Sequence, residues 1–96
     1  MSRDWDPRKA IVNLRKQGIT FTEAASVLLD QLAEWEFDTT HSDDEDRWRV
    51  MGRSNRNRIL VVTVTPRAGR FRVISARRAT KRERHAYDHQ RPLGPS

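Results

Sequence analysis

The first third of the chain alternates apolar and polar residues at the spacing of helices. Asp6-Pro7 is typical of a helix start, because the aspartate caps free amides and proline at the first helical position loses no bond. Gly18 is a natural left-handed terminator, so the first helix is predicted between these points. Its apolar face is predicted at Ala10, Ile11 and Leu14.

A second helix and a series of strands follow in the pattern. Residues Thr20 to Glu23 fit a capping box, and apolar positions continue at helical spacing as far as Leu32. Beyond this point apolar and charged residues alternate, which is typical of half-buried strands. Strands are predicted at Ala33–Asp38, Arg47 to about Gly52, Ile59–Val64 and Phe71–Ala76.

Turn signals connect these strands in an antiparallel order. Thr39–Asp46 is predicted as an acidic loop, and Ser54–Asn57 has turn composition. Ile59–Val64 is a continuous β-branched run, as expected for a central strand buried on both faces. Pro66–Gly69 then turns the chain back, so the last two strands are predicted to form a hairpin.

The last part of the chain predicts a third helix, and the order of all predicted elements indicates the fold class. Thr80–Glu83 is another capping box, opening a helix predicted to run to about His89. The fold is predicted as α+β: an extended start, two N-terminal helices, a four-stranded antiparallel sheet and a C-terminal helix, with the helices on one face of the sheet. Residues 1–90 are predicted to form one domain and residues 91–96 a disordered tail.

Composition narrows the class of protein. The chain has 96 residues, which suits one domain with one modest core. No stretch approaches the roughly 18 apolar residues that cross a bilayer, and no signal peptide is visible, so a cytoplasmic protein without membrane contact is predicted. The absence of cysteine excludes disulfides, thiolate catalysis and cysteine-ligated metals.

Charge is distributed unevenly along the chain. Residues 1–46 carry five basic and eleven acidic residues for a net charge of −6, whereas residues 47–96 carry fourteen basic and two acidic residues for +12. Sixteen of the nineteen cationic residues are arginine, whose planar guanidinium binds phosphate and stacks on bases. The second half therefore favours a polyanion such as RNA, with a solvated basic surface as the alternative.

Several short motifs resemble those of a known family, the BrnT toxins, over roughly residues 5 to 88. The opening matches at Trp5-Asp6-Pro7, Lys9-Ala10, Asn13, Lys16, Gly18 and Phe21, the middle at Gly52-Arg53 and Leu60-Val61-Val62, and the end at Ile74-Ser75-Ala76-Arg77-Arg78-Ala79-Thr80, Glu83-Arg84 and Tyr87. The closing motif is the most specific part of this resemblance. In one departure, Gln17 stands where family members commonly have a histidine before the glycine.

The resemblance implies a RelE-like fold and RNA cleavage that stops translation. It further implies a BrnA-like ribbon-helix-helix antitoxin as partner, with operator DNA bound only through the toxin–antitoxin complex. If the family histidine takes part in proton transfer, a chain with Gln17 lacks that group.

Metal-free RNA cleavage requires proton transfer to and from oxygen and cations for the charge that develops on phosphorus. Arg77 at the exit of the last strand, with Lys81 and Arg84 in the first turns of the final helix, can converge on one phosphate beside helix amides. Tyr87 follows one turn later and is predicted to stack a base, act as a weak acid or pack the helix. The predicted catalytic residues are therefore Arg77, Lys81, Arg84 and Tyr87, with RNA-binding residues Arg53, Arg67, Arg72 and Arg78.

Plainer interpretations compete for these and other residues. Glu83 suits a capping box better than a general base, and Arg77 can instead form a structural ion pair with the acidic half. His85 and His89 lie four apart on the predicted helix but lack a third ligand, so no metal and no cofactor are predicted. The aromatic residues Trp35, Trp48 and Phe71 favour core packing over a base-stacking platform, and Arg47, Arg49, Arg56, Arg58 and Arg70 favour solvated positions.

The sequence thus predicts a ribonuclease toxin, with a non-catalytic nucleic-acid-binding or regulatory module as the alternative. The two functions differ in how they depend on single arginines. A binder loses affinity in small steps as arginines are removed, whereas a catalyst loses turnover steeply at one or two positions.

Overall fold

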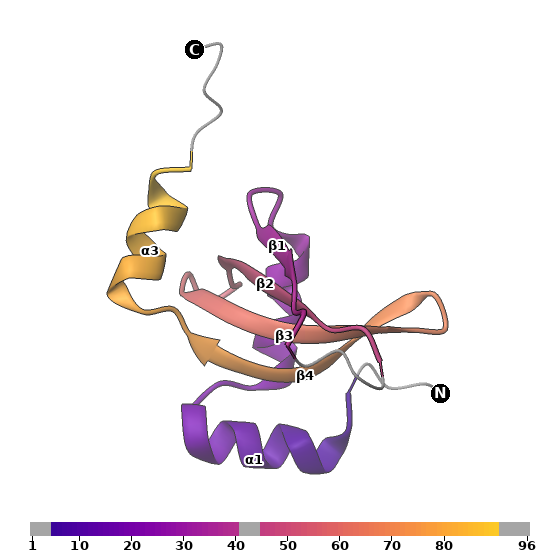
Figure 1. The fold of residues 1–96 in the computed structure, drawn as a ribbon. Helices are drawn as coiled ribbons and strands as arrows, with labels where there is room; N and C mark the ends of the chain where they lie inside the picture. The colour runs from indigo at the N-terminus through magenta and orange to yellow at the C-terminus, as the bar shows by residue number, and fades with distance from the viewer. Residues whose placement is uncertain (1–4, 41–44, 91–96) are drawn as a thin grey trace.

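In the part of the chain that the structure describes, four antiparallel strands form one sheet in the order β1-β2-β3-β4, with three helices around it (Figure 1). The strands are β1 (Glu34–Phe37), β2 (Trp48–Arg53), β3 (Ile59–Arg67) and β4 (Arg70–Arg78). The helices are α1 (Pro7–Gln17), α2 (Phe21–Ser26) with the short 3₁₀ turn η1 (Val27–Leu29), and α3 (Lys81–Asp88). This computed structural model describes residues 5–40 and 45–90, so the predicted tail at 91–96 and part of the predicted acidic loop lie outside it. The predicted α+β architecture is confirmed.

Helix α1 begins and ends where the sequence predicts but turns a different face to the sheet. The Asp6 carboxylate accepts a bond from the Arg8 amide, and Gly18 ends the helix with a φ of 70°. Ile11 and Leu14, predicted as buried, are 53% and 48% exposed, so that prediction is wrong. The buried residue of this helix is Asn13.

Helix α2 is shorter than predicted, and its capping glutamate is used elsewhere. The Thr20 hydroxyl accepts from the Glu23 amide, as a capping box requires. The Glu23 carboxylate does not complete the box but accepts bonds from Ser54 and Arg58. The helix ends at Ser26, η1 follows, and Leu32 is 55% exposed rather than part of a helical face.

The sheet is covered on both faces, which corrects the prediction that all helices share one face. Alternate residues of β3 point to opposite sides. Leu60, Val62 and Val64 lie in the main core with α2 residues, whereas Ile59 and Val61 form a second cluster with Ala79 and Tyr87. Because α1 and α2 already cover the first face, α3 buries Tyr87 against the other, and Figure 1 shows it beyond the end of β4.

The outer edge of β4 is closed by the N-terminal part of the chain. Trp5 forms an isolated parallel bridge with Val73, which confirms the predicted extended start. Further along, the Asn13 side chain accepts a bond from the Ala76 amide and donates one to the Ile19 carbonyl, both 3.0 Å long. At its turn, the β3–β4 hairpin has positive φ at Ala68 and Gly69, as a tight two-residue connection needs.

Replacing Asn13 by alanine should lower the free energy of unfolding by about 2–4 kcal/mol, because it leaves a buried amide and a buried carbonyl without partners. Urea unfolding of the purified protein measures this change. The control is Val12→Ala on the same helix, where the side chain is 54% exposed and the effect should stay within about 0.5 kcal/mol. Equal losses in the two variants would show that Asn13 does not hold the edge.

Candidate nucleic-acid interface

The junction between β4 and α3 presents arginines on both faces of the sheet. Arg77 pairs with Val61 and Arg78 with Leu60, so the alternation of a strand sends their side chains to opposite sides. The Thr80 hydroxyl and the Glu83 carboxylate form the predicted capping box and start α3 immediately after the strand. Arg77 and Arg78, both predicted site residues, therefore lie on two different surfaces.

Four arginines gather in one concave site, which we call the basic cleft. It has a volume of about 200 Å³ and includes a single carboxylate. Its lining comes from the end of β2, the turn and start of β3, the end of β4 and α3, and comprises Arg53, Asn57, Arg58, Ile59, Arg78, Arg84 and Asp88. Three of the eight predicted residues, Arg53, Arg78 and Arg84, thus come together here.

Neighbouring groups orient the guanidinium groups of the basic cleft. Arg84 donates to the Ala79 carbonyl at 3.0 Å, and Arg53 donates to the Asn57 side chain at 2.9 Å. Arg53 also lies 3.7 Å from the Asp88 carboxylate. These long or neutral contacts leave donor capacity for an anion, since each guanidinium carries five N–H groups.

Arg58 is held by a buried carboxylate, which the sequence did not reveal. Its side chain donates twice to Glu23, which is 2% exposed and also accepts from the Ser54 hydroxyl at 2.7 Å. The bond from Arg58 is the main reason that the pKa of Glu23 lies below its ordinary value, against the opposing effect of burial. The prediction of a solvated Arg58 is wrong, because Arg58 anchors the turn between β2 and β3 to α2.

Asp30 joins three elements beneath the basic cleft. Its carboxylate accepts from the Arg53 amide at 2.7 Å and from the Tyr87 hydroxyl at 2.5 Å, in addition to the Leu32 amide. Burial alone would raise the pKa of Asp30, but these hydrogen bonds outweigh it and leave the pKa lowered. Gly52 makes this approach possible, because a Cβ there would lie 3.0 Å from the Asp30 carboxylate.

Tyr87 is part of this support rather than of the open surface. The residue is 5% exposed, and the Arg53 guanidinium lies 5.6 Å from its ring centroid. Burial, followed by the hydrogen bond to Asp30, raises the pKa of Tyr87. The arrangement favours packing over base stacking or acid catalysis for this residue.

Arg77 forms a two-pronged ion pair with Glu83 on the other side of β4. The two bonds are 2.8 and 3.0 Å long, and the Arg77 side chain remains 42% exposed. The bond from Arg77 is the largest cause that lowers the pKa of Glu83 to about 2, with the Thr80 amide assisting and burial opposing. Glu83 is therefore a cap and an ion-pair partner, and its low pKa makes it a poor base at neutral pH.

Arg67 and Arg72 lie apart from the basic cleft. They line a separate hollow of about 200 Å³ near the hairpin end of the sheet, together with Lys9, Asp6 and Glu45. Arg72 precedes Arg78 by six strand residues, which corresponds to roughly 20 Å. Lys81 is exposed at the first position of α3, near the cleft end of the sheet.

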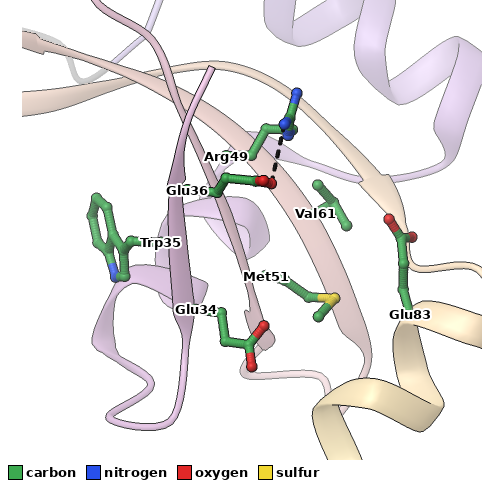
Figure 2. A pocket seen from close by; sticks show the side chains of 7 residues that line it. All are labelled: Glu34, Trp35, Glu36, Arg49, Met51, Val61 and Glu83. Atoms are coloured by element: carbon green, nitrogen blue, oxygen red, sulfur yellow. Dashed lines mark hydrogen bonds and ion pairs between the residues drawn. The ribbon is translucent and has the colours of Figure 1, made fainter. Parts of the chain in front are cut away.

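A larger and more acidic groove of about 600 Å³ lies on the face of the sheet that carries Glu83 (Figure 2). Met51 and Val61 lie between Glu34 and Glu36 of β1 on one side and Glu83 on the other, and Arg49 pairs with Glu36 at 3.0 Å. The groove is a further concave surface, but its carboxylates suit a phosphate poorly.

The aromatic residues form a surface cluster instead of the predicted core. Trp35, Phe37 and Phe71 are 37–40% exposed. The centroid distances are 5.0 Å from Trp35 to Phe71, 5.2 Å from Phe37 to Trp48 and 6.5 Å from Trp35 to Trp48. Only Trp48 packs against the main core.

His85 of α3 and His89, which caps the C-terminal end of the helix, lie side by side with ring centroids 4.0 Å apart. Within residues 5–40 and 45–90, no three histidine or acidic side chains gather as a metal site requires. In the same part of the chain, no helix is long and apolar enough to span a bilayer.

Comparisons with known proteins give a family and a solved relative. The model of the family described as "Ribonuclease toxin, BrnT, of type II toxin-antitoxin system" matches residues 5–83. The 1.1 Å crystal structure of the Brucella abortus ribonuclease toxin BrnT is similar with a TM-score of 0.60 and 28% sequence identity, over 80% of this chain and 94% of that chain. A comparison with curated proteins gives no match.

The ion pair between Arg77 and Glu83 should make folding depend on acid. A carboxyl with a pKa of about 2 in the folded protein and 4.5 ordinarily stabilises the fold fully above pH 4.5 and loses this contribution as the pH falls toward 2. Chemical unfolding across pH 2–5 should therefore show a shallower pH dependence in Glu83→Gln than in the wild type. Arg77→Gln should flatten the same window, because it removes the cause; parallel curves for all three proteins would rule out this ion pair.

Proposed function

The chain belongs to the BrnT family of type II ribonuclease toxins, and we propose on this premise that it is a cytoplasmic, metal-independent endoribonuclease that stops translation. A BrnA-like antitoxin neutralises it, and operator DNA is contacted only through their complex. The observation that carries the proposal is the basic cleft of about 200 Å³, which is lined by four arginines and Asp88, with Arg58 paired to Glu23 and the other three arginines available to an anion. This charge and shape suit a phosphate of a polyanion.

Within the proposed site, cations stabilise charge on the reacting phosphate. Arg78 and Arg53 bind the phosphate in the cleft, and Arg84 reaches it from the second turn of α3. Lys81 supplies further positive charge at the start of the same helix, where amide groups also point outward, whereas Arg77 lies on the other face of β4 with its charge paired by Glu83. Such preorganised charges act most strongly on the transition state, in which negative charge on the phosphate oxygens grows.

In contrast to the sequence prediction, neither Tyr87 nor Glu83 is proposed to transfer a proton. Tyr87 and Glu83 have pKa values moved away from neutrality in opposite directions, so neither suits general acid–base catalysis near pH 7. Tyr87 is proposed as a positioning residue that holds Arg53 and Asp30. The same observation favours the second candidate function, a module that binds RNA without cutting it.

We propose that the separate hollow lined by Arg67 and Arg72 contacts the RNA away from the basic cleft. At roughly 20 Å from the cleft, Arg67 and Arg72 can reach only a different phosphate of the same RNA. They therefore contribute to affinity and not to the chemical step.

The antitoxin is proposed to cover the region from Arg77 to Tyr87 with an acidic or apolar segment and so exclude RNA.

Two matched double variants test the proposed site. Arg78→Ala with Arg84→Ala should reduce RNA cleavage by about 100-fold or more, because both contacts act on the reacting phosphate. Arg67→Ala with Arg72→Ala removes the same charge and should reduce cleavage less than about tenfold. The measurement is cleavage of single-stranded RNA in EDTA, accompanied by growth arrest on induction and by the melting temperature of each variant.

Similar losses from the two folded pairs would contradict the assignment of the basic cleft. The binding module would be established instead if the wild-type protein binds RNA in EDTA but cuts it neither in EDTA nor after magnesium is added. Cutting that appears only with magnesium would refute metal independence while leaving the site in place.

The purified complex with the antitoxin should cut RNA far more slowly than the free protein, because the segment over Arg77 to Tyr87 excludes the substrate. RNA cleavage by the two preparations at equal toxin concentration measures this. If the complex cuts as fast as the free protein, neutralisation by occlusion is wrong.

A further inference from the structure

Strand β1 leaves one edge of the sheet open within residues 5–40 and 45–90. In the ladder with β2, the Asp38 amide donates to the Arg47 carbonyl, which identifies a hydrogen-bonded pair. Such pairs alternate along antiparallel strands, so Glu36 and Glu34 also bond to β2. The backbone amides and carbonyls of Trp35 and Phe37 therefore point away from the sheet.

The two edges of the sheet differ in how they are protected from further strand pairing. Trp5 and Asn13 close the β4 edge, whereas β1 is regular and lacks proline, lysine and bulges, which commonly protect an edge. All four side chains of β1 are exposed, although two of them are large aromatics. An unprotected edge with exposed aromatic residues is a template for strand addition.

The two faces of β1 differ in chemistry. On one face, Trp35 and Phe37 join Trp48 and Phe71 in the aromatic cluster. Glu34 and Glu36 point to the other face, as Figure 2 shows for Trp35 against the two glutamates. Arg49 bonds to Glu36 and also lies 3.7 Å from Asp38, while Glu34 has no ion pair among the described residues.

The chemistry of the two faces of β1 determines which kind of molecule can bind at its open edge. A second copy adding across a two-fold axis would place the glutamates of the two β1 strands opposite one another, and opposed like charges destabilise a strand pair. RNA is disfavoured by the same carboxylates and by Glu45 and Asp46 just before β2. A protein segment with basic residues on one face and apolar residues on the other fits both sides.

We propose that β1 is a docking edge at which an extended segment of a partner protein adds as a fifth, antiparallel strand. Apolar side chains of the segment pack on Trp35 and Phe37, and alternate basic side chains face Glu34 and Glu36. The docking edge shares no residue with the basic cleft, so this inference goes beyond the proposed function and does not depend on RNA cleavage.

The test uses a blocked seven-residue peptide in which lysine and valine alternate, titrated into the full chain. In an antiparallel pair, directly opposed residues share a face, so the valines would lie opposite Trp35 and Phe37 and exchange hydrogen bonds with them. N-methylation of the valines should weaken binding about tenfold or more, whereas N-methylation of the lysines should be tolerated. Binding is measured by the amide NMR signals of Trp35 and Phe37.

A charge swap provides the matched control. A peptide with glutamate in place of lysine should bind the wild type more weakly, and Glu34→Lys with Glu36→Lys should reverse this preference while the melting temperature shows that the variant folds. Equal effects of the two N-methylation patterns, or no binding of the lysine–valine peptide, would overturn the proposal. Protection of the Trp35 and Phe37 amides by single-stranded RNA, or by self-association, would overturn it in favour of those occupants.

Discussion

The carboxylate of Asp30 holds together the parts of the structure on which the candidate site depends. It accepts bonds from β2 through the Arg53 amide and from α3 through the Tyr87 hydroxyl, so positions 30, 53 and 87 meet at one group. Hydrogen bonds to a charged partner contribute about 1.5–3 kcal/mol each to stability, so loss of this carboxylate would strongly destabilise the fold. Because Gly52 lacks a side chain, Asp30 can approach β2 closely, and α3 is fixed across the end of the sheet. Arg84 on α3 and Arg53 on β2 then face the same cleft.

The alternation of a strand determines how the positive charge is used. Neighbouring residues Arg77 and Arg78 point to opposite faces of β4, so one pairs with Glu83 while the other lines the basic cleft. The acidic half of the chain contributes through Glu23, which fixes Arg58 from beneath, and through Glu34 and Glu36 at the opposite edge of the sheet. The arginines of the basic cleft and the glutamates of β1 thus lie on different surfaces, which suits an anion at one surface and a basic protein segment at the other.

Local patterns in the sequence predicted most elements of this fold. The caps at Asp6 and Thr80, the terminator Gly18 and the β-branched run of β3 act within a few residues, so local chemistry determines them. The errors concern long-range contacts. Side-chain spacing could not show that α1 turns Asn13 inward or that α3 covers the second face, because both depend on which surfaces other elements have already buried. In the site, sequence proximity grouped Arg77 with Arg84, whereas the contacts of Arg58 and Asp30, across 35 and 23 residues, carry no local signal.

The proposed function requires the basic cleft to bind a phosphate of RNA. It is tested most directly by the salt dependence of affinity for a fully 2′-O-methylated single-stranded RNA, which lacks the hydroxyl needed for cleavage. Each phosphate contact adds roughly 0.7 to the slope of log affinity against log salt concentration. Because the cleft binds one phosphate, replacing Arg53, Arg78 and Arg84 together by alanine should lower the slope by about 0.7 in a protein that remains folded. An unchanged slope in that folded variant would show that the RNA binds to another surface and not to the basic cleft.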